Sequence, residues 1–344
     1  YFYDLNAKTN FRLGSTGTLL LSGYFGRDRF KVQDRFAASW GNAAGTLRWN
    51  QAFGNRLFSK STLTVSNYDY GLEFLGIGRD LAWTSRIGSV DFQVDEAFHL
   101  SNGNTLEFGG QVTWHDIRPG SIRPVGNSPV VPLDLQPRYG LSPALHLSHE
   151  VELSSRVSVR YGVRLAGFRR TGPATIYRYE GDAPVRYQPA LGRYQRGRIV
   201  DSTRYQSGDL ITSAMGLEPR LSLRVGVSPS ASLKGSYSRT RQFLHLVSNT
   251  NSPTPVDIWE PIGPYLKPQL SDQVAFGYTQ TWGNAGYELS VETYYKWLSR
   301  VTDFIDGADI ALNDRLETEM LQGSGRAYGL EVYARKQVGR ITGW

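Results

Sequence analysis

Two histidines three positions apart, His146 and His149, are the residue pair in this sequence that most suggests a metal site. A zinc or copper ion needs several ligands that converge on one point. The residues around this pair follow the pattern of a strand, in which residues three apart point to opposite faces. The sequence also has no cysteine that could add a thiolate ligand. We therefore expect no metal site and no bound cofactor.

Paired carboxylates and a histidine–aspartate pair are the candidates for catalysis. Glu288 and Glu292 fall on the same face of a predicted strand, where they could act as acid and base. A charged lumen wall with arginines opposite explains them better. His115 and Asp116 lie at a strand end, which favours an interfacial or lumen pair over a catalytic dyad. Because the chain has no G-x-S-x-G motif and no Ser/His/Asp set, we predict that it is not an enzyme.

A glycine-rich segment, GSGRAYG at residues 323–329, has the composition of a phosphate-binding loop. Such a loop needs a strand before it and a helix after it. Here a strand follows the glycines. We therefore interpret the segment as the entry of a loop into a strand.

The best candidates for ligand contact lie in a loop at residues 241–267. This loop holds His245, Asp257, Trp259 and Glu260 among several prolines, which stiffen the backbone. Ligand sites often lie on loops that a rigid scaffold carries. The alternative is a loop that only packs against neighbouring loops.

A second long loop, residues 170–210, is polar and rich in arginine and tyrosine. Arg193, Tyr194, Arg196 and Arg198 could meet an anionic ligand or lipopolysaccharide phosphates. We take Arg193 and Arg196 as candidate contact residues. The alternative is a solvated charged loop.

These candidates are carried by strands, and residues 286–300, GYELSVETYYKWLSR, show the strand pattern most clearly. Successive side chains of a strand point to opposite faces. One face carries Tyr287, Leu289, Val291, Thr293, Tyr295 and Trp297, and the other carries Glu288, Ser290, Glu292, Tyr294 and Lys296. Aromatic rings at both ends of an apolar face are typical of a strand that crosses a bilayer.

Variants of this unit recur along the chain, and we predict about thirteen antiparallel strands. We expect short turns at residues 14–17, 53–55, 101–104, 154–155, 228–231 and 283–286. We expect loops at residues 28–35, 71–79, 118–139, 170–210, 243–269 and 301–322, the last with a helical turn at 315–321. Long strands joined by alternating short and long connections are typical of transmembrane barrels.

Composition excludes several other classes of protein. Apolar residues make up 40% and charged residues 20% of the 344 residues, so the chain is not disordered. No run of about 18 apolar residues could form a transmembrane helix. The net charge of +7 comes from scattered basic residues, and we therefore expect no nucleic-acid partner.

The two faces of the strands decide the fold class. Arginine, glutamate and aspartate on one face cannot form the core of a soluble sandwich. A polar lumen and a lipid exterior satisfy both faces, and closure removes the unpaired edges that lipid forbids. We therefore predict an all-β fold, an antiparallel transmembrane β-barrel. A soluble β-propeller or adhesin, the alternative, would have shorter strands.

Several segments closely resemble the barrel of TonB-dependent outer-membrane receptors, especially those typical of the Bacteroidetes. They include YSRTRQFLHLVSNT (237–250), TPVDIWEP (254–261), LKPQLSDQ (266–273), YELSVETYYK (287–296) and GSGRAYGLEVYARKQVGRITGW (323–344). FYDLNAKTNFRL (2–13) and LSGYFGRDRF (21–30) also resemble it. The resemblance therefore touches both ends of the chain.

The resemblance implies a barrel of about 22 strands in the bacterial outer membrane, with short periplasmic turns and long extracellular loops. It implies uptake of a scarce ligand, such as a metal chelate, vitamin, glycan or peptide, driven by TonB through a plug domain inside the barrel. The implied partners are this plug, TonB, outer-membrane lipid and lipopolysaccharide, and a surface lipoprotein. A passive porin or a structural outer-membrane barrel is the alternative function.

The sequence differs from the family pattern in its extent. We expect residues 1–344 to form a single barrel segment, truncated at both ends, with about thirteen of the 22 strands. No plug or TonB-box segment is visible in the sequence. We therefore expect this segment to lack the part that couples energy to transport.

Overall fold

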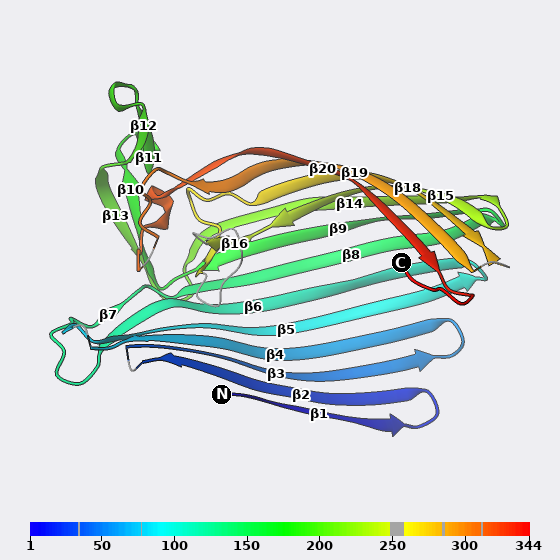
Figure 1. Ribbon diagram of the computed structural model, residues 1–344, viewed down its shortest axis with the longest axis horizontal. Coiled ribbons are helices and arrows are strands. Elements are labelled where there is room, and N and C mark those ends of the chain that lie inside the picture. Colours follow the sequence, from blue (N-terminus) through cyan, green and yellow to red (C-terminus); the bar gives the residue numbers. More distant parts are fainter. Residues whose placement is uncertain (34, 77, 248–257, 284–285, 311) are drawn as a thin grey trace.

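The computed structural model describes residues 1–33, 35–76, 78–247, 258–283, 286–310 and 312–344. Thirteen strands follow one another in a single antiparallel sheet, and a short fourteenth strand, β7, pairs with β6 (Figure 1). The thirteen are β1 (Phe2–Leu13), β2 (Gly17–Val32), β3 (Phe36–Phe53), β4 (Leu57–Phe74), β5 (Leu81–Ser101), β6 (Asn104–Pro124), β8 (Arg138–Ser154), β9 (Val157–Thr171), β14 (Leu210–Ser228), β15 (Ala231–Gln242), β18 (Gln269–Trp282), β19 (Tyr287–Phe304) and β20 (Met320–Lys336). The predicted all-β antiparallel fold and the number of strands are confirmed.

The strands of this sheet are long, with 12 to 21 residues each. Tight turns join them at one end, and most of the longer connections lie at the other (Figure 1). The sheet path ends at β1 and β20, which do not pair with each other in the described part of the chain. The described strands therefore form a curved, open portion of a barrel wall.

The strand register separates an apolar face from a polar face. Leu21, Leu47, Leu63, Phe92 and Val112 lie opposite one another across β2 to β6, and all five side chains are exposed. Opposed residues in antiparallel strands point to the same side of the sheet. This apolar row requires a nonpolar surrounding, so it marks the outer, lipid-facing side of the wall.

The neighbouring positions form the inner face. Arg48, Thr62, Gln93 and Gln111 lie opposite one another across β3 to β6. On β14, Leu221 and Leu223 remain 49% and 42% exposed, so the apolar side chains of the wall form no closed protein core. The predicted polar lumen and apolar exterior agree with this arrangement.

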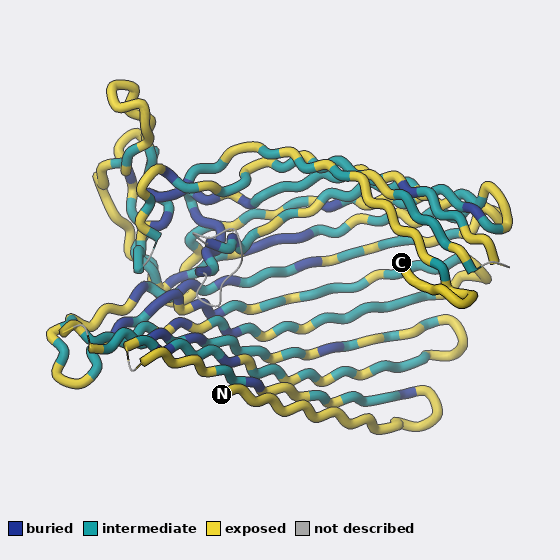
Figure 2. Tube along the Cα trace, viewed as in Figure 1, coloured by how far each residue is buried: buried dark blue, intermediate teal, exposed yellow. Residues whose placement is uncertain are grey.

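Burial is concentrated where the strands meet the long connections (Figure 2). The described hydrophobic cluster lies there and joins Val247, Ile258, Leu266, Leu316 and Met320, with Phe304 and Ile310 packed against it. These residues come from two long connections that are distant in the sequence. The extracellular-type loops of this chain therefore have a small core of their own.

Several connections that we predicted as loops contain strands. Residues 170–210 contain β10 (Ala174–Tyr179) paired with β13 (Ile199–Tyr205), and β11 (Val185–Gln188) paired with β12 (Arg193–Arg196). Residues 243–269 contain the hairpin of β16 (Leu244–Val247) and β17 (Ile258–Pro261). The two segments are long connections, as predicted, but the prediction missed these short strands because they pair with one another and not with the wall.

The remaining differences concern strand ends. The predicted loop at residues 118–139 is shorter, because β6 extends to Pro124 and β7 (Leu133–Asp134) pairs with it. The predicted loop at residues 28–35 is also mostly strand, since β2 continues to Val32. The two ends of the loop predicted at residues 301–322 belong to β19 and β20. Within this segment, a 3-10 turn at Leu316–Thr318 confirms the predicted helical turn. No helix in the described ranges is long and apolar enough to cross a membrane.

Candidate functional site

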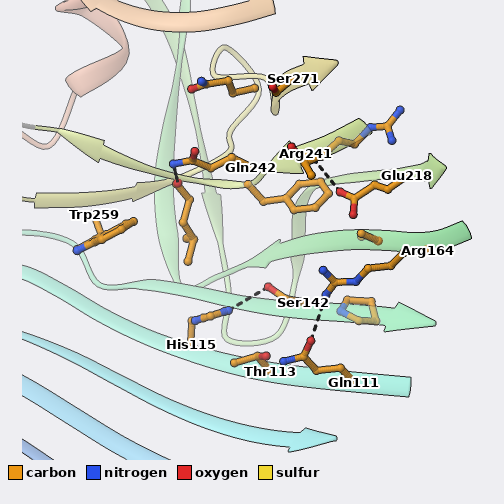
Figure 3. A pocket seen from close by; sticks show the side chains of 17 residues that line it. Gln111, Thr113, His115, Ser142, Arg164, Glu218, Arg241, Gln242, Trp259 and Ser271 are labelled. Atoms are coloured by element: carbon orange, nitrogen blue, oxygen red, sulfur yellow. Dashed lines mark hydrogen bonds between the residues drawn. The ribbon is translucent and has the colours of Figure 1, made fainter. Parts of the chain in front are cut away.

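A pocket of about 580 Å³ opens on the inner face of the wall, near the end with the long connections (Figure 3). Its walls come from β6, β8, β9, β14, β15 and β18, and the hairpin β16–β17 covers part of it. Polar side chains dominate the lining, among them Gln111, Thr113, His115, Ser142 and Arg164. Neighbouring inner-face positions of several strands therefore converge on one site.

Hydrogen bonds among β6, β8 and β9 fix polar side chains of the pocket. His115 Nε2 lies 3.0 Å from Ser142 Oγ. Arg164 donates from Nη2 to Gln111 Oε1 over 3.1 Å (Figure 3). These side chains are held in place before any ligand enters, which reduces the entropy that a ligand must overcome.

A column of rings supports the pocket from one side. Phe168 stacks on His115 with ring centroids 6.0 Å apart, and on Phe243 with centroids 6.1 Å apart. Phe168 is itself almost fully buried. Gly140 makes this packing possible, since a Cβ there would lie only 2.2 Å from Phe168 Cζ. The pocket thus has a rigid aromatic support beneath its polar surface.

The hairpin β16–β17 turns its two faces toward different neighbours. Leu246 pairs with Trp259, and Trp259 lines the pocket. His245 pairs with Glu260, and both are buried on the opposite face. Of the predicted contact residues that the structure describes, Trp259 is therefore the one that borders this pocket.

Glu260 attaches the hairpin to the barrel wall. Its Oε1 accepts a hydrogen bond from Arg170 Nη1 over 3.1 Å, and its other oxygen forms an ion pair with Arg138. The side chains of Arg138, Glu260 and Arg170 are only 3%, 8% and 11% exposed. Because a buried charge without a partner is costly, this triad holds the hairpin firmly against β8 and β9.

His245 is buried on the same face of the hairpin as Glu260. Its Nδ1 lies 3.3 Å from the hydroxyl oxygen of Thr302. Its Nε2 is buried and has no hydrogen-bond partner among the described residues. Burial lowers the pKa of His245 below the usual range, so the imidazole is neutral at physiological pH.

The two predicted arginines lie in a different part of the loops. Arg193 and Arg196 belong to β12, in the hairpin that projects away from the wall (Figure 1). Arg193 is exposed, and neither residue lines the pocket. The remaining predicted contact residue, Asp257, lies outside the described residues. The structure thus brings His245, Trp259 and Glu260 together and leaves the arginines apart from them.

Arg196 joins two long connections. Its guanidinium contacts both carboxylate oxygens of Glu319, at 2.5 and 3.0 Å. Burial would raise the pKa of Glu319, but the hydrogen bonds from Arg196 and from the backbone of Asp309 outweigh burial, and the pKa is lowered. Glu319 is therefore ionised, and it anchors the β12 region to the segment before β20.

A second contact between the same connections joins Tyr179 and Glu317. Tyr179 donates a hydrogen bond to Glu317 Oε1 over 2.8 Å. Burial raises the pKa of both Tyr179 and Glu317. Together with the Arg196–Glu319 pair, this contact links the connection after β9 to the connection after β19.

Sequence reasoning missed the wall residues of the pocket as ligand candidates. The signal was present, because Gln111, Thr113 and His115 alternate with apolar residues and form the polar face of one predicted strand. What the alternation did not show was which strands bring their polar faces together beneath a loop.

His146 and His149 point to opposite faces of the wall, as predicted. His146 lies on the inner face, 3.7 Å from Asp95, whereas His149 forms a hydrogen bond with Tyr161 on the outer face. Within the described ranges, no group of three or more His, Asp or Glu residues could hold a metal ion.

The fold and its faces define a class, the bacterial outer-membrane β-barrels. The family described as "TonB dependent receptor-like, beta-barrel" matches residues 1–344. The chain therefore belongs to this family of transport receptors, whose barrels lie in the bacterial outer membrane. No curated protein sequence matches the chain.

Solved structures of such receptors share this fold. The Serratia marcescens hemophore receptor HasR, solved with its hemophore HasA and heme, matches with a TM-score of 0.67 at 11% identity, over 98% of this chain and 52% of HasR. The copper transporter OprC matches with a TM-score of 0.69 at 10% identity, over 98% and 51%. The alcaligin receptor FauA from Bordetella pertussis matches with a TM-score of 0.62 at 11% identity, over 98% and 50%. The chain thus spans about half the length of these relatives.

Proposed function

We propose that this chain forms part of the wall of a TonB-dependent receptor that imports a scarce ligand through the outer membrane. The observation that carries the proposal is the pocket on the inner face, where strand-borne polar groups and Trp259 meet beneath a tethered hairpin. Solved proteins with this fold include a hemophore receptor, a copper transporter and an alcaligin receptor. Such a site suits capture of a ligand before transport, and we propose no catalytic role.

The partners follow from the same proposal. A plug domain would occupy the polar lumen, and TonB would act on that plug. The outer apolar face would contact outer-membrane lipid and lipopolysaccharide, while the projecting β11–β12 hairpin would be free to contact ligand or a surface lipoprotein. Among the residues predicted for ligand contact, we assign Trp259 to the pocket and Arg193 to the projecting hairpin.

Growth that depends on the receptor tests this function. A strain that lacks the parent gene would be supplied with single candidate ligands, namely iron chelates, copper, cobalamin, glycans or peptides, and complemented with the full-length receptor. We expect one ligand class to support growth only with the receptor and only when TonB is present. Uptake that persists without TonB would instead identify a passive porin and refute the proposal.

A further inference from the structure

Five cationic side chains lie on the inner face of three neighbouring strands, β9, β14 and β15. They are Arg160, Arg164, Arg220, Arg224 and Lys234. On β9 and on β14 the two arginines are four residues apart, and the register places Arg224 opposite both Ser158 and Lys234. Residues at even spacing and residues opposite one another share a face of the sheet. All five therefore point to the same side as Arg164, which lines the pocket described above.

These five residues, which we call the basic row, follow one another in steps along the wall. Arg220 lies opposite Gly162, which is midway between Arg164 and Arg160 on β9. In the same way, Arg160 is level with the midpoint between Arg220 and Arg224 on β14. Each step from one level to the next is therefore two residues, or about 7 Å. The row extends for about 20 Å from the pocket toward the end with the tight turns (Figure 1).

Three members of the basic row carry charges that the wall does not balance. Arg220, Arg224 and Lys234 are exposed, and none of these side chains forms a hydrogen bond or an ion pair with a residue that the structure describes. Glu292 on β19 is level with Lys234, but Gly277 lies between them and no ion pair joins them in the described part of the chain. The three positive charges are therefore available to a ligand.

A groove of about 650 Å³ follows the basic row on the inner face. Four of the five cations line it, namely Arg160, Arg164, Arg220 and Lys234. Small residues lie between them and leave the long side chains room to move, among them Gly162, Ser222 and Ser236. Arg164 and Gln111 line both this groove and the pocket, so the two spaces are adjacent along the wall.

The acidic side chains near the groove do not neutralise the basic row. Glu107 forms an ion pair with Arg160, and Asp95 forms one with Lys60 at 2.8 Å. Glu218 is buried and accepts a hydrogen bond from a backbone N–H of β15. A cleft that carries an excess of one sign of charge raises the local concentration of ions of the opposite sign. The groove therefore favours an anionic occupant.

We propose that the basic row guides an anionic ligand from the pocket toward the tight-turn end of the barrel, so that the ligand class of this receptor is anionic. This inference rests on the proposed transport function and adds the charge of the ligand to it. Arginine and lysine side chains line pores that select anions, and several weak sites in series let an ion enter and leave. Arginine forks also match the oxygens of carboxylates and phosphates.

A docked surface of the plug fits the basic row less well than a small anion does. The row consists of like charges with glycine and serine between them, so it offers no apolar core for an interface between folded domains. Its cations are evenly spaced and begin at the pocket. These features suit a ligand that moves from one level to the next.

Ion selectivity of the purified full-length receptor tests the row without knowledge of the ligand. Single channels would be recorded in planar bilayers across a KCl gradient, in urea at concentrations at which the barrel keeps its folded electrophoretic mobility while a plug in the lumen unfolds. The variant Arg220→Gln/Arg224→Gln/Lys234→Gln removes the three unbalanced cations. We expect the ratio of chloride to potassium permeability to fall by about twofold or more near 0.1 M salt. The effect should shrink near 1 M salt, where the screening length is only about 3 Å.

Two controls distinguish the loss of charge from the loss of a side chain. Arg220→Lys/Arg224→Lys keeps the charges and should keep the wild-type permeability ratio. Arg204→Gln removes an exposed arginine of β13, away from the groove, and should also leave the ratio unchanged. An unchanged ratio in the triple variant would overturn the proposal. Triple-variant channels that open at a lower urea concentration with an unchanged ratio would show that the row holds the plug instead.

The charge of the imported ligand is an independent test. The ligand that supports receptor-dependent growth should carry a net negative charge at pH 7, and the triple variant should need a severalfold higher concentration of it for half-maximal growth. A neutral glycan or a copper ion as the ligand would overturn the proposal. Growth without TonB would refute the transport function but would leave the permeability ratio unaffected, so the two failures are distinguishable.

Discussion

The tether between the hairpin β16–β17 and the wall gives the sharpest test of the site. Replacing Glu260 by Gln keeps the size of the side chain but removes its charge. Arg138 and Arg170, 3% and 11% exposed, then lose the carboxylate that contacts them both, and Glu317 remains as the acidic group that acts on Arg170. Removing one member of a buried ion pair costs about 3–5 kcal/mol. The hairpin can lower this cost by swinging away and letting water reach both arginines.

Hydrogen exchange measures that opening directly. In full-length receptor, the amide protons of residues 244–247 and 258–260 exchange when the hairpin opens. A loss of about 3–5 kcal/mol should raise the opening constant by between about a hundredfold and several thousandfold. The long strands of the wall should keep their protection. The matched control is Asp201→Asn, which breaks the exposed Arg178–Asp201 pair and should cost less than about 1 kcal/mol.

The double variant Glu260→Gln/Arg170→Gln distinguishes the effect of buried charge from that of side-chain packing. It leaves one buried arginine in place of two, so its hairpin should open less often than that of Glu260→Gln alone, and the two changes should not be additive. Wild-type exchange in Glu260→Gln would refute the reasoning. It would mean that water already solvates both arginines and that apolar packing alone holds the hairpin.

Three other predictions concern the ligand, the pH response and the lipid face. Trp259→Ala should weaken ligand binding by about 2 kcal/mol, measured by titration on the full-length receptor, with little change in hairpin exchange, because the ring borders the pocket. His245 has a lowered pKa, so its contribution to docking is present above the usual pKa of about 6.5 and is lost as the pH falls below that value. The opening constant of the hairpin, obtained from exchange corrected for the intrinsic rate at each pH, should therefore rise as the pH falls from about 7.5 to 5.5, and His245→Gln should abolish that rise. Val291→Arg on the lipid face should destabilise the folded barrel by about 2–4 kcal/mol in urea titrations, whereas Ser290→Arg on the inner face should cost far less. Equal effects of these two substitutions would mean that the faces are wrongly assigned.

The wall could be predicted from the sequence because one physical rule governs all of it. In residues 287–297, apolar and polar side chains alternate at most positions, and the structure places Val291 opposite Val332 and Glu292 opposite Glu331. The bilayer and the lumen impose the same requirement on each strand, so each strand repeats the same pattern. Local alternation therefore carried the information on the number, length and faces of the strands.

The loops could not be predicted in the same way, because their strands are short and depend on each other. Arg193 to Arg196 carry no alternation that differs from a polar loop, yet they form β12 by pairing with β11. Arg196 is fixed by Glu319, which is 123 positions away in the sequence. A contact between such distant residues leaves no signal in either segment alone.

Residues 257–260 of the candidate site show that composition alone does not reveal which side chains share a face. Sequence composition grouped Asp257, Trp259 and Glu260 as one contact surface, because polar and aromatic residues gather there. In a two-stranded hairpin, however, neighbouring side chains must point to opposite faces. Trp259 can border the pocket only if Ile258 and Glu260 point away from it, into the loop core and toward the arginines. The anchor and the contact surface are therefore separated by the strand period itself, and a substitution at Trp259 can change the ligand without releasing the charge that holds the hairpin in place.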